Sequence, residues 1–222
     1  MLPPDIFLFL EELKENNHKE WFDNNRERYQ QIRQSVLHLA EIMVHEIGMF
    51  DKLVYGLEAK DCTYRINRDI RFSADKSPYK THTGIFVCPG GKNSGMAGYY
   101  LHIEPGNSFI GGGVYMPQSP ALKAIREEIY ENYEGFLEVI TSKPFLSNFG
   151  EFYGEKLKTK PKGFPESFPG IEFLKLKHFT VIKNLSNEVA LSEKLLDEIR
   201  NTFTALYPLN NFMNQALREK FQ

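Results

Sequence analysis

The sequence lacks the features that identify several classes of protein. Its 222 residues include only two cysteines, Cys62 and Cys88, too few for a disulfide framework or a four-cysteine zinc site. No apolar run approaches membrane-spanning length, and the N-terminal stretch lacks the basic start of a signal peptide. The net charge is −2, so the whole surface is not the basic footprint of a nucleic-acid-binding protein. These absences predict a soluble, cytoplasmic protein without a membrane partner.

Motifs for common cofactors and catalytic groups are missing as well. There is no dinucleotide fingerprint, no Gly-x-Ser-x-Gly elbow and no kinase signature. Residues 90–95 have the composition of a phosphate-binding loop but not its spacing, and they predict a hairpin turn. The six histidines contain no His-x-His, His-x-x-x-His or His-Glu-x-x-His pair. We therefore expect no cofactor and no metal ion.

Helical patterns occur at both ends of the chain. Hydrophobic residues make up 41% and charged residues 25%, as in ordinary globular proteins, and the length predicts a single domain over residues 1–222. Apolar spacing predicts a helix from Asp5, and a longer helix that starts with a capping box at Asn17 and ends at Gly48. Further helices are predicted at residues 119–130, 133–142, 171–177 and 195–206, and a separate last one from Pro208.

The middle of the chain has the alternation of β-strands. Strands are predicted at residues 62–67, 81–88, 98–104, 108–116 and 178–182, with a surface loop at 154–169. Short turns between consecutive strands favour an antiparallel meander. The predicted fold class is α+β, a mostly antiparallel sheet flanked by N-terminal and C-terminal helices.

The two faces of this sheet are expected to differ. Alternation puts Leu101 on an apolar face, and Tyr100 and His102 on the other. Gly111 and Gly113 follow on the same side as His102, within a strand where glycine is costly. Such glycines allow the close approach of a ligand, another backbone or a packed helix, and the sequence leaves these alternatives open.

Basic residues concentrate between Lys60 and Lys80, where six Lys and Arg accompany three Asp. Guanidinium groups placed this close together repel one another unless an anion or carboxylates lie among them, and their planar fork suits phosphate. We therefore predict a site for a small anionic ligand. The predicted ligand-binding residues are Arg65, Arg68, Arg71, Lys76, Tyr79, Lys80 and Tyr100.

A purely structural role for these arginines is the alternative, because pairs with Asp61, Asp69 and Asp75 would fix an irregular loop onto the sheet. Among the histidines, His82 and His102 stand out because neighbouring strands would put them on one face, near Asp69 and Glu104, as an acid–base pair or, as the less favoured alternative, a weak metal site. The candidates for acid–base catalysis are accordingly Asp69, His82 and His102.

The basic segment also resembles a known family. Its motif is matched by Arg65, Arg68, Asp69, Arg71, Phe72, Asp75, Lys76 and Tyr79. The likeness extends over nearly the whole chain, including residues 98–103, 111–113 and 208–212. In these motifs the sequence resembles the family designated domain of unknown function 2461. That resemblance implies that the motif positions matter, and it assigns none of them a role.

Two classes of function remain from the sequence. The first is binding of a small, phosphate-bearing ligand in an Arg- and Lys-lined groove, with hydrolysis or transfer as the reaction if the protein is an enzyme. The second is a non-catalytic module for nucleic acid or an acidic protein partner. The oligomeric state does not follow from the sequence.

Overall fold

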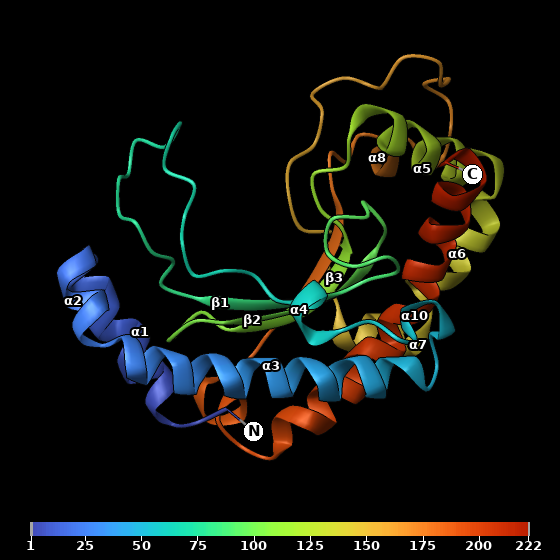
Figure 1. The fold of residues 1–222 in the computed structure, drawn as a ribbon. Coiled ribbons are helices and arrows are strands. Elements are labelled where there is room, and N and C mark those ends of the chain that lie inside the picture. Colours follow the sequence, from blue (N-terminus) through green and yellow to red (C-terminus); the bar gives the residue numbers. More distant parts are fainter. Residues whose placement is uncertain (1, 222) are drawn as a thin grey trace.

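The computed structural model describes residues 2–221, with side chains as far as Arg218. The chain is α+β: helices precede and follow a four-stranded sheet, as the sequence predicts (Figure 1). Between β3 (Phe109–Val114) and β4 (Phe179–Asn184) lie four helices: α5 (Ser119–Glu131), α6 (Tyr133–Thr141), α7 (Lys143–Asn148) and α8 (Ile171–Leu174). A short helix, α9 (Asn187–Ala190), follows the sheet.

The N-terminal helices are α1 (Asp5–Glu15), α2 (Lys19–Asn24) and α3 (Arg26–Gly48). The predicted capping box at Asn17 is wrong, because His18 caps α2 through the Trp21 amide, 3.4 Å away. Asn17 instead binds the backbone of Tyr79 on both sides, donating to its carbonyl and accepting from its amide. The long helix ends at Gly48 as predicted, and its apolar face is buried at Ile32, Val36, Leu39, Met43 and Ile47.

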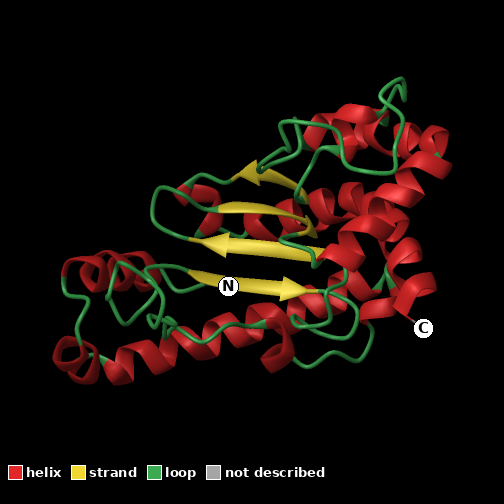
Figure 2. Cartoon of the chain, turned by 90° about the horizontal axis from the view of Figure 1, so that it is seen from above, coloured by secondary structure: helices red, strands yellow, loops and turns green. Residues whose placement is uncertain are grey.

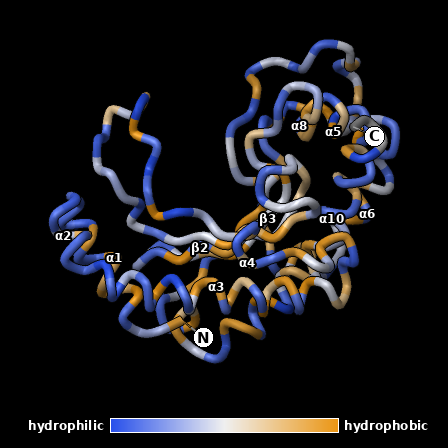
Figure 3. Tube along the Cα trace, in the orientation of Figure 1, coloured by the Kyte–Doolittle hydropathy of each residue, from blue (hydrophilic) through white to orange (hydrophobic). Residues whose placement is uncertain are grey.

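The sheet is an antiparallel meander with the strand order β1-β2-β3-β4 (Figure 2). Its strands are β1 (Thr83–Val87), β2 (Gly98–Ile103), β3 (Phe109–Val114) and β4 (Phe179–Asn184). The strand expected at residues 62–67 does not form. Cys62 ends the short helix α4 (Ala59–Cys62), and after it only single bridges join Thr63 to Ile85 and Asn67 to Tyr79. The segment between α4 and β1 is therefore a largely hydrophilic loop (Figure 3).

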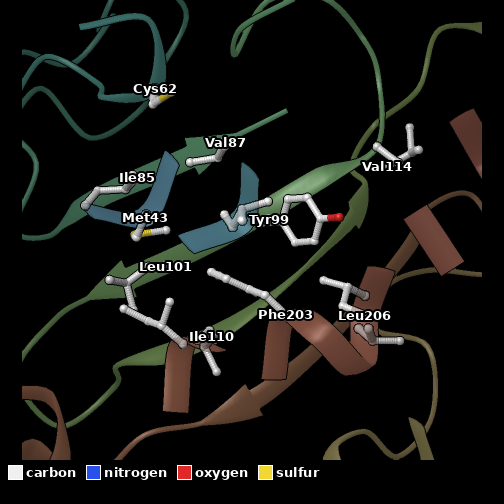
Figure 4. Close-up of a cluster of buried hydrophobic side chains, with 14 of the residues drawn as sticks. Met43, Cys62, Ile85, Val87, Tyr99, Leu101, Ile110, Val114, Phe203 and Leu206 are labelled. Atoms are coloured by element: carbon white, nitrogen blue, oxygen red, sulfur yellow. The ribbon is translucent and has the colours of Figure 1, made fainter. Parts of the chain in front are cut away.

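One face of the sheet forms the core of the protein. Tyr99, Leu101 and Ile110 point toward α3 and α10 (Lys194–Phe221), where they meet residues such as Met43 and Phe203 (Figure 4). Complete burial of a large apolar side chain contributes about 1.5–3 kcal/mol, so this layer holds the sheet against the helices. The predicted division of the sheet into two unlike faces is confirmed by the register of β2 with β3.

The C-terminal helix differs from the prediction. Pro208 does not start a new helix but lies inside α10. Proline removes one backbone hydrogen bond, yet the helix continues because Leu206, Leu209 and Met213 are buried on either side of it. The packing of α10 against the sheet therefore outweighs the free-energy cost of the hydrogen bond lost at Pro208.

In the described part of the chain, no helix lies directly over the other face of the sheet (Figure 2). The loop between α4 and β1 rises at one end of this face, and α5 and α8 stand at the other (Figure 1). In the part of the chain that the structure describes, no helix combines the length and apolar character that crossing a membrane requires.

Candidate functional site

The open face of the sheet holds a cavity of about 390 Å³, which we call the aromatic groove. Residues of all four strands line it, and Tyr64, Tyr115 and Tyr153 line it from outside the strands. Its ring-bearing lining residues are Tyr64, Phe86, Tyr100, His102, Phe109, Tyr115 and Tyr153. The volume lies within the range of roughly 300–1,000 Å³ that is usual for small-molecule sites.

The glycines of β3 serve the approach of neighbouring strands. A Cβ added at Gly111 would lie 2.1 Å from the carbonyl oxygen of Val181 on β4. At Gly113, where φ is +106°, it would lie 2.0 Å from the carbonyl oxygen of Phe179. Of the alternatives left open by the sequence, backbone approach therefore accounts for both residues. Only glycine at these two positions allows β3 and β4 to lie as close together as they do beneath the groove.

A second, smaller cavity of about 50 Å³ adjoins the groove, and we call it the basic cavity. Most of its lining is apolar, with side chains of α1 and α3, and the basic side chains among it are Arg33 from α3 and Arg65 and Lys80 from the loop. None of its lining residues is acidic. A water needs roughly 10–15 Å³ of such space, so the cavity can hold a group the size of phosphate. Tyr64 and Tyr100 line both cavities, so the two cavities are neighbours at these side chains.

Arg65 and Lys80 have different local partners. The Lys80 ammonium donates to the carbonyl oxygen of Arg65 at 2.9 Å and lies 5.5 Å from the centroid of the Tyr64 ring. Burial and the neighbouring Arg65 lower the pKa of Lys80. Within residues 2–218, the Arg65 guanidinium makes no hydrogen bond or ion pair, so its donors are free for an anion.

The other predicted cations do not line either cavity. Arg68 pairs with Asp75 and donates to the carbonyl oxygen of Ser77 at 3.2 Å. Arg71 binds Asp69 through two hydrogen bonds of 2.9 and 2.6 Å. Lys76 donates to a backbone carbonyl at 3.0 Å. A structural role, the alternative considered from the sequence, therefore fits Arg68 and Arg71. Of the three arginines, Arg65 is the one that lines a cavity together with Lys80.

Asp75 is the carboxylate that holds the tip of this loop. Its pKa is lowered to about 2 by hydrogen bonds from the side chain and amide of Ser77 and by Arg68. Because the pKa falls on folding, the stabilisation is complete above the unfolded-state pKa and is lost as the pH decreases through about 2.

We expect Arg68→Ala to lower the melting temperature by no more than a few degrees. The side chain of its partner Asp75 is 59% exposed, and exposed ion pairs contribute little to stability. Thermal melts of Arg68→Ala beside Arg71→Ala, whose pair is also exposed, would measure this. A much larger loss for Arg68→Ala alone would show that its bond to the Ser77 carbonyl holds the loop.

Two further predicted residues lie outside both cavities. Tyr79 is buried and stacks on Phe22 with ring centroids 4.0 Å apart, so it anchors the end of the loop to α2. The Asp69 carboxylate is exposed and is occupied by Arg71. Neither side chain lines the cavities that Tyr100 and His102 line.

The two histidines lie close together, although His82 lies in a bend before β1 and not on a strand as predicted. The ring centroids of His82 and His102 lie 4.5 Å apart, and Phe109 stacks on the His102 ring with centroids 4.6 Å apart. Nδ1 of His102 lies 3.0 Å from the Tyr100 hydroxyl, and Nε2 lies 3.1 Å from Oε2 of Glu104. We call His82, His102 and Glu104 the histidine cluster. His82 lines the basic cavity and His102 the aromatic groove.

Burial shapes the electrostatics of this cluster. It lowers the pKa of His82 to about 4, with a smaller contribution from His102, so His82 is neutral at pH 7. Burial also lowers the pKa of His102, although the hydrogen bond with Glu104 opposes the shift. For Glu104, burial acts to raise the pKa, but hydrogen bonds with Asn107 and His102 outweigh it and the pKa is lowered.

Comparison with known proteins places this arrangement in a family. The family of conserved hypothetical proteins DUF2461 matches residues 5–212, which include both cavities and the histidine cluster. The chain belongs to the DUF2461 family. No curated protein and no solved structure matches it.

This DUF2461 protein has site residues that the sequence did not single out. Arg33 reaches the basic cavity from α3, and no local pattern distinguishes it from other arginines of that helix. Gly84 is the second: a Cβ there would lie 2.5 Å from the Tyr100 hydroxyl. Glycine at this position therefore makes room for the Tyr100 ring, whose hydroxyl reaches His102. The importance of Gly84 could have been noticed from its position opposite His102 in the pairing of β1 with β2.

Proposed function

We propose that this protein binds a small anionic ligand that carries a planar ring, with its phosphate in the basic cavity and its ring in the aromatic groove. The observation that carries the proposal is the junction of the two cavities at Tyr64 and Tyr100. Three cations without a carboxylate among them lie on one side of that junction, and aromatic rings lie on the other. A nucleotide or a similar ring-bearing phosphate matches this arrangement, because it carries its negative charge at one end and a flat ring at the other.

The basic cavity supplies the charge recognition. Arg65 offers an unpaired planar fork, which can bind two phosphate oxygens at once, and Lys80 adds a point charge. Arg33 comes from a different element, so the cations would surround the anion from two sides. Charge-assisted hydrogen bonds of this kind contribute about 1.5–3 kcal/mol each.

The aromatic groove supplies ring recognition. Stacking of a base on an aromatic side chain contributes roughly 1–3 kcal/mol and tolerates different bases. Tyr64 is 38% exposed, Tyr153 is 55% exposed and Tyr115 is 65% exposed, so these rings are available for stacking from the open side. The groove thus accounts for binding of a flat ligand without naming its ring.

The reaction class that we propose is hydrolysis or transfer at the phosphorylated group. Its support is the position of the histidine cluster, whose two imidazoles line the two cavities. Of the three acid–base candidates, His82 and His102 line the cavities, which supports a role for them, whereas Asp69 is occupied by Arg71. His102 is oriented by Tyr100 and Glu104, which fixes its ring in the groove.

Binding of nucleoside monophosphates and inorganic phosphate, measured by calorimetry, tests the proposal. We expect Arg65→Ala to weaken monophosphate binding by about 10-fold or more, because the substitution removes at least one charge-assisted hydrogen bond to the phosphate. Arg71→Ala removes an equally charged, exposed side chain of the same loop and should leave binding unchanged. Equal losses for both variants would contradict a specific anion site at Arg65.

The length of the ligand separates this proposal from the second candidate, a non-catalytic nucleic-acid module. The exposed rings of the open groove favour that candidate, because single strands stack on such platforms. An oligonucleotide series should bind no better than the monophosphate if the basic cavity selects one phosphate. Affinity that grows with length and falls steeply with salt would instead show a strand-binding surface.

A further inference from the structure

The histidine cluster has the donor set of a metal centre. His82, His102 and Glu104 each offer one ligand atom, and these three atoms all lie within 4.8 Å of one another. The residues come from a bend, from β2 and from the turn after it, and twenty positions separate the two histidines in the sequence. Spacing along the chain therefore gives no metal motif, and only the pairing of β1 with β2 brings the donors together.

The closest pair of donors already has the separation of neighbouring metal ligands. Nε2 of His102 lies 3.1 Å from Oε2 of Glu104. Two ligands with bonds of about 2.0–2.2 Å to a tetrahedral ion lie roughly 3.4 Å apart. The third donor needs to move closer by up to about 1.4 Å, since the full set spans up to 4.8 Å. His82 is outside the regular strand and only half-buried, so it can make this adjustment.

Surrounding groups orient the donors as the outer groups of metal sites do. With Nε2 of His102 facing a metal, Nδ1 carries the proton and donates to the Tyr100 hydroxyl, 3.0 Å away. Asn107 donates to Glu104 at 2.9 Å. Phe109 stacks on the His102 ring and limits its rotation. These contacts fix two of the three donors before any ion binds.

We propose that His82, His102 and Glu104 bind a divalent first-row transition metal, with its remaining coordination positions open to the two cavities. Two imidazoles and one carboxylate suit Zn²⁺, Fe²⁺ or Co²⁺, whereas Mg²⁺ and Ca²⁺ prefer oxygen ligands alone. Three protein ligands leave room for water or a ligand group, as in catalytic rather than structural zinc sites. The proposal goes beyond anion binding and uses none of the three cations of the basic cavity.

Cobalt titration of chelator-treated protein, followed by calorimetry and visible absorbance, tests the site. We expect one Co²⁺ to bind, and both His82→Ala and Glu104→Gln to weaken it by at least about 100-fold, because each removes a direct ligand. Tyr100→Phe should weaken it by about 10–100-fold through the orientation of His102. The control is His38→Ala, which removes an exposed histidine that lies 3.4 Å from a carboxylate, Glu41, and should change nothing.

Several outcomes would overturn the proposal. One is the absence of stoichiometric Co²⁺ binding to the wild-type protein, and another is binding that survives both His82→Ala and Glu104→Gln. Loss of binding in His38→Ala would place the ion on the surface instead. Circular dichroism of each variant confirms that it is folded before titration. Arg65→Ala should retain Co²⁺ while losing the monophosphate, so the metal and anion proposals fail or succeed separately.

Discussion

Replacement of Gly111 by alanine is expected to lower the free energy of unfolding by about 3 kcal/mol, at the upper end of overpacking effects. The added Cβ would lie 2.1 Å from the carbonyl oxygen of Val181 and 2.9 Å from Cα of Ile182. Both atoms belong to the backbone of β4, so no side-chain rotation relieves the overlap. Strand β4 must move away from β3, and the hydrogen bonds between the two strands weaken.

Chemical denaturation of Gly111→Ala would measure this loss, which corresponds to a decrease in Tm of about 6–12 °C for a chain of this length. Gly150→Ala is the matched control, because Gly150 is exposed and a Cβ there would meet nothing within 4 Å. Equal stability of the two variants would show that β3 and β4 lie farther apart than described. Because Val181 and Ile182 also line the aromatic groove, Gly111→Ala should in addition weaken binding of a ring-bearing ligand.

Replacement of Asn214 by leucine should also cost about 3 kcal/mol. The side chain of Asn214 on α10 accepts a hydrogen bond from the Ala97 amide at 2.8 Å and donates to the Ala97 carbonyl at 3.1 Å. Asn214 and Ala97 are both buried, so leucine leaves two backbone groups without a partner or water. Each such group costs about 1–3 kcal/mol. Leucine keeps the branched shape of the asparagine side chain and leaves no cavity, so the loss does not report an empty space.

Thermal and urea unfolding of Asn214→Leu, compared with Asn201→Leu, would check this expectation. Asn201 lies on the same helix but is exposed, so its replacement should change stability by no more than about 0.5 kcal/mol. A similar small effect at Asn214 would mean that the start of β2 does not depend on α10. The Asn210 amide, which donates to the Gly98 carbonyl at 3.0 Å, adds to the same attachment.

Local patterns in the sequence determined most of the elements and the character of each sheet face. The apolar spacing of Ile32 to Ile47 predicts the buried face of α3, because the helical period alone decides which side chains share a side. The alternation in residues 98–103 likewise predicts that Tyr100 and His102 leave the core. The approach of His82 and His102 could be expected from the sequence, since strands that follow one another along the chain are usually neighbours in a sheet.

Only the tertiary structure decided which charged and polar groups meet. Arg33 reaches the basic cavity because α3 lies beside the loop, and no periodicity of α3 reports that position. Arg68 and Arg71 find partners within their own loop, which leaves Arg65 as the free guanidinium. Local propensity was also overruled where burial was stronger: α10 continues through Pro208, while residues 62–67, at the edge of the sheet, gain too few partners to form a strand. Local periodicity encodes helices and strands, whereas the site depends on contacts between distant residues that only packing fixes.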